Sequence, residues 1–127
     1  MSMNFDQARF NMVEQQIRTW EVLDAQVLEL LESSHREDFV PVRYRKMAFS
    51  DIAVPLDHDQ AMMKPVVEGR LLQALELKAD ETVLEIGTGS GFVTACLAQM
   101  AKRVVSVDIH EQFTSEAAAK LKEKGID

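Results

Sequence analysis

The sequence has little of what marks a secreted or membrane-bound protein. Cys96 is the only cysteine among the 127 residues, so the chain cannot form an internal disulfide. The N-terminal residues lack the basic start and the apolar run of a signal peptide, and no stretch approaches the roughly 18 apolar residues of a membrane span. We therefore expect a soluble, cytoplasmic protein in which Cys96 is buried as a small hydrophobic residue.

Basic residues are also scarce. Lys and Arg number 14 against 21 Asp and Glu, so the net charge is −7. A negative chain is a poor general nucleic-acid binder and is not attracted to anionic membranes, so we expect neither partner. The apolar share of 46% is that of a folded globular domain, not of a disordered chain.

The residue pattern divides the chain into two parts, 1–78 and 79–127. The first part predicts helices joined by an irregular crossing loop at 50–64, and the second alternates strand, helix, strand and helix. Strands that alternate with helices are typical of parallel βαβ units, so the predicted fold class is α/β. The expected helices are Asp6–Thr19, Asp24–Ser33, Arg43–Phe49, Pro65–Leu77, Phe92–Ala101 and Glu111–Lys124, and the expected strands are Thr82–Ile86 and Arg103–Val107.

A glycine-rich turn, Gly87-Thr88-Gly89-Ser90-Gly91, follows the first predicted strand directly and leads into a helix. Glycine allows positive φ angles and lets a ligand approach the backbone, and the free N–H groups of a helix start favour an anionic group. Asp108 ends the second predicted strand, where a carboxylate can accept hydrogen bonds from two ribose hydroxyls. This pattern predicts a nucleotide-type cofactor site. A tight structural turn without a ligand is the plainer alternative.

The spacing of the glycines bears on the kind of cofactor. The dinucleotide fingerprint needs a further glycine where this chain has Phe92, which disfavours NAD and FAD without excluding them. The sequence Glu85-x-Gly87-x-Gly89-x-Gly91 instead resembles the first motif of class I S-adenosylmethionine-dependent methyltransferases. That resemblance implies a Rossmann-like domain that binds S-adenosylmethionine. It places Glu85, Gly87, Thr88, Gly89, Gly91 and Asp108 around the cofactor.

The N-terminal part narrows the resemblance. Met12–Arg18, Arg36–Pro41, Tyr44, Ala48–Asp51 and Val54–Leu56 are similar to segments of the protein-L-isoaspartate O-methyltransferase family, as is Val104–Asp108. The resemblance implies a protein-repair enzyme that methylates the α-carboxylate of isoaspartyl residues in damaged proteins or peptides. The chain would then hold the N-terminal helices and the first βαβα unit of the fold, in truncated form.

The chain departs from that family in two respects. The family's active-site serine falls at Met63 and the threonine before it at Ala61; methionine cannot donate a hydrogen bond to a carboxylate, although Lys64 could supply a cation beside it. The chain also stops where a third strand would begin. We therefore expect this piece to be inactive alone and to self-associate. A methyltransferase with a changed substrate and a non-catalytic binding module remain alternatives. Metal binding is not expected, because the side chains of Asp57, His58 and Asp59 point in different directions.

Overall fold

A computed structural model covers the chain and describes residues 4–126. The chain forms two compact units. The first comprises the chain up to Val54 together with Met63–Glu76, and the second comprises Pro55–Met62 together with the chain from Leu77 onward. The loop segment Pro55–Met62 therefore belongs with the strands of the second unit. None of the described helices is long and apolar enough to cross a membrane.

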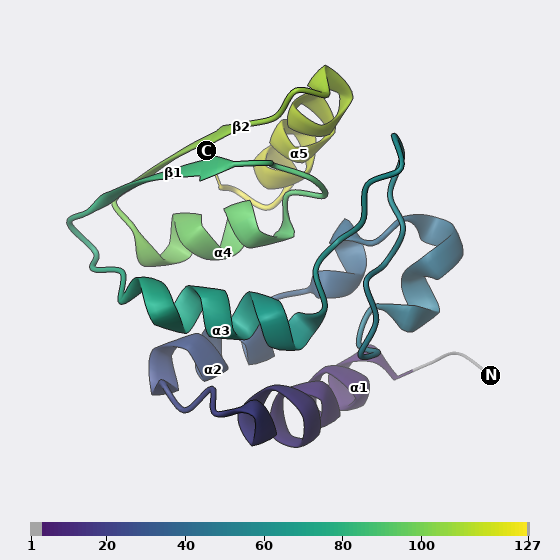
Figure 1. Cartoon of the computed structure of the whole chain (residues 1–127), viewed down its shortest axis with the longest axis vertical. Helices are drawn as coiled ribbons and strands as arrows, with labels where there is room; N and C mark the ends of the chain where they lie inside the picture. The colour runs from purple at the N-terminus through teal and green to yellow at the C-terminus, as the bar shows by residue number, and fades with distance from the viewer. Residues whose placement is uncertain (1–3, 127) are drawn as a thin grey trace. The chain divides into compact units, whose positions relative to one another are not determined.

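The first unit is helical (Figure 1). Its elements, in chain order, are α1 (Phe5–Met12), the π-helix η1 (Val13–Ile17), the 3-10 helix η2 (Arg18–Trp20), α2 (Ala25–Ser33), the 3-10 helices η3 (Arg36–Phe39) and η4 (Val42–Met47), and α3 (Pro65–Leu75). The N-cap residue of α2 is Asp24, whose side chain accepts a hydrogen bond from the Val27 N–H at 3.1 Å. The first helix begins at Phe5, one residue before the expected start, and its N-cap is Asn4, through the Gln7 N–H, rather than Asp6.

The buried face of the first helical segment differs from the predicted one. A regular helix would place Phe10, Val13, Ile17 and Trp20 on one face. Val13 and Ile17 are fully buried, whereas Phe10 and Trp20 are 50% and 58% exposed. The π-helical turn and the 3-10 turn after it change the angle per residue, so the α-helical spacing does not hold across them.

Helix α3 also buries a different face from the one that its leucines indicate. The spacing of the apolar residues predicts a buried stripe of Val67, Leu71, Leu72 and Leu75. Only Leu72 of these is buried, and the other buried apolar residues are Pro65, Val66 and Gly69. A Cβ atom on Gly69 would lie 2.9 Å from the Ile17 Cγ2 atom, so glycine is what lets α3 approach η1 this closely. Close backbone packing, not side-chain size, selects the buried face.

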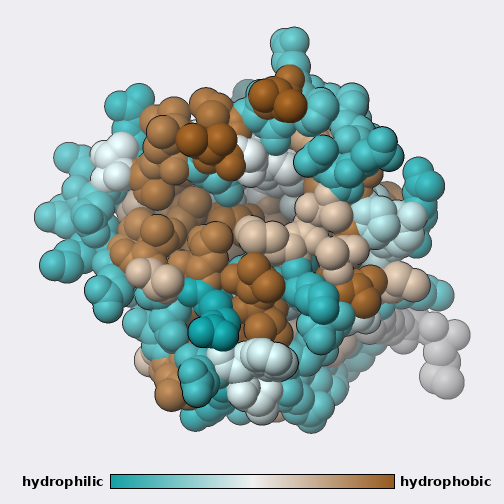
Figure 2. All heavy atoms as spheres, in the orientation of Figure 1, coloured by the Kyte–Doolittle hydropathy of each residue, from teal (hydrophilic) through white to brown (hydrophobic). Residues whose placement is uncertain are grey.

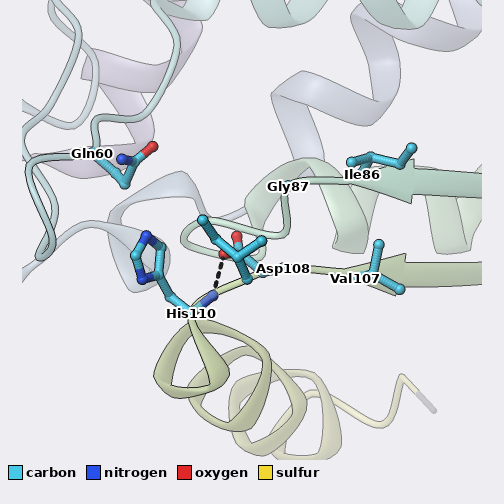
Figure 3. Close-up of a pocket in the computed structure, with 7 residues that line it drawn as sticks. Gln60, Ile86, Gly87, Val107, Asp108 and His110 are labelled. Atoms are coloured by element: carbon cyan, nitrogen blue, oxygen red, sulfur yellow. Dashed lines mark hydrogen bonds between the residues drawn. The ribbon is translucent and has the colours of Figure 1, made fainter.

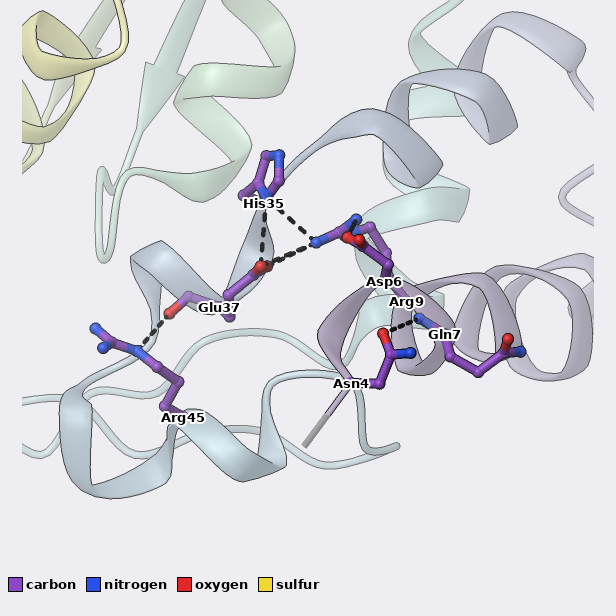
Figure 4. Close-up of polar contacts among 7 residues, drawn as sticks. All are labelled: Asn4, Asp6, Gln7, Arg9, His35, Glu37 and Arg45. Atoms are coloured by element: carbon purple, nitrogen blue, oxygen red, sulfur yellow. Dashed lines mark hydrogen bonds and ion pairs between the residues drawn. The ribbon is translucent and has the colours of Figure 1, made fainter. Parts of the chain in front are cut away.

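Two buried ion pairs hold the first unit together. The Arg36 Nε atom lies 3.0 Å from Glu68 Oε1, and both side chains are almost completely buried. The same guanidinium donates to the backbone carbonyls of Ala48 and Met63, and so joins four segments of the unit. The second pair joins Arg9 on α1 to Glu37 at 2.9 Å, as Figure 4 shows.

Burial raises the pKa of Glu68 to about 7, although the charge and hydrogen bond of Arg36 oppose that rise. Because the pKa of Glu68 is higher in the folded than in the unfolded protein, protonation of Glu68 favours folding. This contribution to stability is fully present at a pH below the pKa of the unfolded state. That contribution is lost as the pH rises through about 7.

The second unit contains the predicted strands at their predicted bounds. β1 (Thr82–Ile86) and β2 (Arg103–Val107) pair in parallel, with Thr82 opposite Arg103 and Ile86 opposite Val107. Helix α4 (Phe92–Met100) connects them, and α5 (Glu111–Glu123) follows β2. These elements confirm the predicted βαβα unit (Figure 1).

The two faces of this sheet differ. Val83, Glu85, Val104 and Ser106 alternate onto the face toward α4, while Leu84, Ile86, Val105 and Val107 lie on the opposite face. The second set is solvent-exposed, with Ile86 at 82%, and Figure 2 shows hydrophobic surface over the two strands. Within residues 4–126, β1 and β2 pair only with each other, so each strand has one unpaired edge.

Candidate functional site

The glycine turn lies between the carboxyl end of β1 and the start of α4. Gly87, Gly89 and Gly91 all have positive φ angles, of 99°, 54° and 88°. A Cβ on Gly87 would meet no atom within 4 Å, so this glycine leaves open space beside the backbone. The Gly87 N–H donates to the Val107 carbonyl at 2.7 Å and ties the turn to the end of β2. The turn is therefore fixed in place, and its open side can accept a ligand.

Asp108 connects this turn with the segment that follows β2. One carboxylate oxygen accepts from the Gly89 N–H at 3.1 Å, and the other accepts from the His110 N–H at 2.9 Å. Desolvation raises the pKa of Asp108, but the backbone hydrogen bonds of His110, Gly89 and Thr88 and the charge of His110 together outweigh it, so the pKa is lowered and the group stays ionised at neutral pH. An ionised carboxylate has about four acceptor positions, so two more donors can still bind.

Glu85 is placed differently from Asp108. Its Oε1 atom accepts hydrogen bonds from the hydroxyls of Ser106, at 2.6 Å, and of Thr94 on α4. Thr88 is buried, and its hydroxyl lies 2.6 Å from that of Ser106. Burial raises the pKa of Glu85, and the Ser106 and Thr94 hydrogen bonds oppose that rise. Glu85 therefore supports the glycine turn from the covered face of the sheet.

A pocket of about 360 Å³ lies at the carboxyl ends of the two strands (Figure 3). It is lined by Gln60, Ile86, Gly87, Val107, Asp108, Ile109 and His110. Gly87 and Asp108 are the two predicted site residues in this lining. Gly89 contributes its N–H to Asp108, and Gly91 is the N-cap residue of α4. Apolar walls and one carboxylate at the end of a parallel strand suit a nucleoside with its ribose hydroxyls on Asp108.

The glycine spacing that predicts Gly87 and Asp108 does not point to Gln60, Ile109 or His110. Ile109 and His110 directly follow Asp108, and the ends of parallel strands meet at one edge of a sheet, so their positions could have been inferred. Gln60 comes from the Pro55–Met62 loop, and no local pattern signals its place in the pocket. Among residues 4–126, His, Cys, Asp and Glu side chains form no group of three that could hold a metal ion.

Met63 and Lys64, the residues considered for the substrate carboxylate, belong to the first unit. The Met63 carbonyl accepts from Arg36 at 3.0 Å, and its side chain is 38% exposed. Lys64 is exposed at the N-cap position of α3. Ala61 lies in the second unit and forms an antiparallel bridge with Pro55.

The fold and the pocket define a Rossmann-like βαβα unit with a candidate ligand pocket at the carboxyl ends of its strands. The family model of protein-L-isoaspartate(D-aspartate) O-methyltransferase matches residues 7–127. The chain therefore belongs to the protein-L-isoaspartate O-methyltransferase family, and the resemblance of its motifs is confirmed.

Individual relatives agree with this assignment. The Opitutus terrae protein-L-isoaspartate O-methyltransferase is 38% identical over an alignment that covers 97% of this chain and 54% of that protein. Protein-L-isoaspartate O-methyltransferase 1 of Pelobacter propionicus is 42% identical, with 84% of this chain and 49% of that protein covered. The chain spans about half the length of the curated relatives that it matches.

Two solved structures show the same fold. A protein-L-isoaspartate O-methyltransferase superposes with a TM-score of 0.75 at 22% identity, over 94% of this chain and 39% of that one. A Plasmodium falciparum protein described as belonging to the same enzyme type has a TM-score of 0.75 at 16% identity, over 96% of this chain and 56% of its own. The latter was solved in complex with S-adenosyl-L-homocysteine.

Proposed function

We propose that the second unit binds S-adenosylmethionine in the pocket beside Gly87 and Asp108. The observation that carries this proposal is the Asp108 carboxylate, which is held at the pocket by the N–H groups of Gly89 and His110. Its remaining acceptor positions suit the two ribose hydroxyls of the cofactor. The glycine turn leaves room for the ligand beside its backbone.

We further propose that the protein takes part in methylating isoaspartyl carboxylates, as the names of its relatives suggest. The bound cofactor supplies a methyl group on a sulfonium sulfur, for transfer to a carboxylate oxygen. A carboxylate with a pKa of about 4 is already ionised at neutral pH, so the chain need not supply a general base. The task of its residues is then to position the cofactor and to exclude water.

A methyl-transfer assay tests this activity. The protein would be incubated with S-adenosylmethionine labelled in its methyl group and with matched isoaspartyl and aspartyl peptides. With a longer form of the protein we expect base-labile methyl ester on the isoaspartyl peptide only, whereas the 127-residue chain alone is expected to be inactive. Ester on both peptides, or on the aspartyl peptide alone, would contradict the proposed substrate. Because the chain spans about half of its relatives, the assay should include the 127-residue chain and any longer form of the protein.

Met63 provides a sharper test of substrate recognition. If it occupies the position of the family's serine, Met63→Ser should increase methylation of the isoaspartyl peptide, because a hydroxyl can donate to the substrate carboxylate. A gain of about threefold or more in kcat/KM is expected, since one hydrogen bond to a charged group is worth roughly 1.5–3 kcal/mol before losses in positioning. Met47→Ser, at another exposed methionine of the same unit, is the matched control. A change no larger than that of the control would exclude this role for position 63.

The two-stranded sheet leads us to propose self-association. Each strand has an unpaired edge within the described part of the chain, and Leu84, Ile86, Val105 and Val107 are exposed on one face. Unpaired edges and large apolar patches favour association with another chain. Light scattering after gel filtration is expected to show dimers or larger species at tens of micromolar. A cooperatively folded monomer at that concentration would refute the proposal.

A further inference from the structure

The Pro55–Met62 loop contains two residues in an unfavourable backbone conformation. His58 and Asp59 have φ angles of 59° and 57°, in the left-handed region that residues other than glycine rarely adopt. The turn is closed by two backbone hydrogen bonds, from the Leu56 N–H to the Gln60 carbonyl at 2.8 Å and from the Gln60 N–H to the Asp57 carbonyl at 3.2 Å. Positive φ at both central residues is the geometry of a type I′ turn, which His and Asp can adopt, and contacts from outside the loop also hold the turn in place.

These contacts come from the start of α5. The imidazole ring of His58 stacks on that of His110, with centroids 4.2 Å apart and planes 8° from parallel. Phe113 packs edge-on against both rings, each at 5.5 Å. Gln112 binds the loop twice: its Oε1 lies 2.9 Å from His58 Nε2, and its Nε2 donates to Asp57 at 2.8 Å. The loop is thus attached to α5 through the side chains of His58 and Asp57.

The same attachment shapes the ligand pocket. Gln60 lines the pocket from the loop, and His110 lines it from the segment between β2 and α5 (Figure 3). His110 also donates its backbone N–H to Asp108. A displacement of the loop would therefore remove one wall of the pocket and disturb the residue next to the ribose-binding carboxylate.

We propose that His58 and His110 are positioning residues, whose stacked rings hold the Pro55–Met62 loop as a wall of the cofactor pocket and release it on acidification. The expected effect on cofactor binding rests on the proposed binding of S-adenosylmethionine, whereas the role of the stack in holding the loop does not. Neither ring needs to touch the reacting atoms. Their role is to keep Gln60 at the pocket while the cofactor is bound.

The expected effect of pH follows from the charges around the pair. Histidine is the side chain whose charge changes between about pH 5 and 8. The charged groups nearest the pair in the chain are carboxylates: Asp57 and Asp59 on the loop, Asp108 after β2, and Glu111 and Glu116 on the first half of α5. The lysines of α5, Lys120 and Lys122, lie in its last turn. A second proton places like charges on two parallel rings 4.2 Å apart, which favours their separation.

Two variants distinguish the stacking of the His58 ring from its protonation. His58→Ala removes the ring, while His58→Phe keeps an aromatic ring that cannot be protonated. Hydrogen–deuterium exchange of the ligand-free chain at pH 7.5 is expected to show at least about tenfold faster exchange of the 55–62 segment in His58→Ala, because the loop loses its anchor. His58→Phe should remain within about threefold of the wild type. Unchanged exchange in His58→Ala would overturn the positioning role.

Binding of S-adenosylhomocysteine, measured by calorimetry at pH 7.5 and 5.5, tests the link to the pocket. Wild-type affinity should fall at least about fivefold at the lower pH, and His58→Phe should lose most of that dependence. His35→Phe is the matched control, because the third histidine lies in the first unit and should leave the fall intact. An equal fall in His58→Phe and the wild type would overturn the pH-sensitive release. If the wild type binds no S-adenosylhomocysteine at either pH, the proposed function fails, while the exchange experiment still decides the role of His58.

Discussion

Arg36→Met is expected to destabilise the first unit by roughly 3–5 kcal/mol, the cost of removing one partner of a buried ion pair. The Arg36 side chain is 1% exposed and pairs with Glu68, which is 3% exposed. The substitution also leaves the carbonyls of Ala48 and Met63 without this donor. Urea unfolding followed by the fluorescence of Trp20 measures the effect, because the only tryptophan lies in the same unit.

The pH dependence of this variant gives a second, independent readout. Arg36 lowers the pKa of Glu68 from the value that burial alone would give, so its removal should raise that pKa above about 7. The variant then holds a proton that the wild type has lost, and its destabilisation should be larger at pH 8 than at pH 6. Arg18→Met is the control, because the Arg18–Glu14 pair is exposed and worth only about 0.3–0.5 kcal/mol. A loss below about 1 kcal/mol in Arg36→Met would contradict the structural role assigned to the pair.

Asp108→Ala is expected to weaken the binding of S-adenosylhomocysteine at least about tenfold. The substitution removes the carboxylate that would accept two ribose hydroxyls, and hydrogen bonds to charged groups are each worth roughly 1.5–3 kcal/mol. It also removes the acceptor that holds the N–H groups of Gly89 and His110 at the pocket. Calorimetric titration of both proteins measures the change in dissociation constant.

Asp80→Ala is the matched control for Asp108→Ala. Asp80 lies in the exposed turn before β1 in the same unit, so its removal changes the net charge equally without touching the pocket. The dissociation constant of S-adenosylhomocysteine from Asp80→Ala should stay within about twofold of the wild-type value. A folded Asp108→Ala protein that binds as tightly as the control would refute the assignment of Asp108.

The strands and the glycine turn were predictable because their signals are local. Each strand is a short apolar run, and Gly87 follows β1 directly, so the bounds of both strands were correctly predicted from the sequence. The position of Asp108 beside Gly89 follows from parallel pairing, which brings the carboxyl ends of the two strands to one edge. Here the local pattern and the topology agree.

The first helical segment was less predictable because its buried face depends on a change of helix type. Nothing in the residues Val13–Ile17 signals a π-helical turn, and that turn separates the exposed ring of Phe10 from the buried Ile17. The buried face of α3 was missed for a related reason. Gly69 has no apolar side chain, so the hydrophobic pattern does not include it. Only the tertiary structure shows that Ile17 packs directly against it.

The lining of the pocket was also only partly predictable from the sequence. Gly87 and Asp108 were identified from spacing, whereas Gln60 reaches the pocket from a loop that precedes β1 in the chain. The stack of His58 on His110 joins residues that are far apart in the sequence, and no periodicity connects them. Contacts of this kind depend on tertiary packing, which a single sequence does not display.

The most direct test of the central claim is a calorimetric titration of the wild-type chain with S-adenosylhomocysteine and, in parallel, with NAD. We expect saturable, one-to-one binding of S-adenosylhomocysteine and no saturable binding of NAD, because the chain has Phe92 where the dinucleotide fingerprint has its third glycine. Binding of NAD in preference to S-adenosylhomocysteine, or of neither ligand by the folded chain, would contradict it.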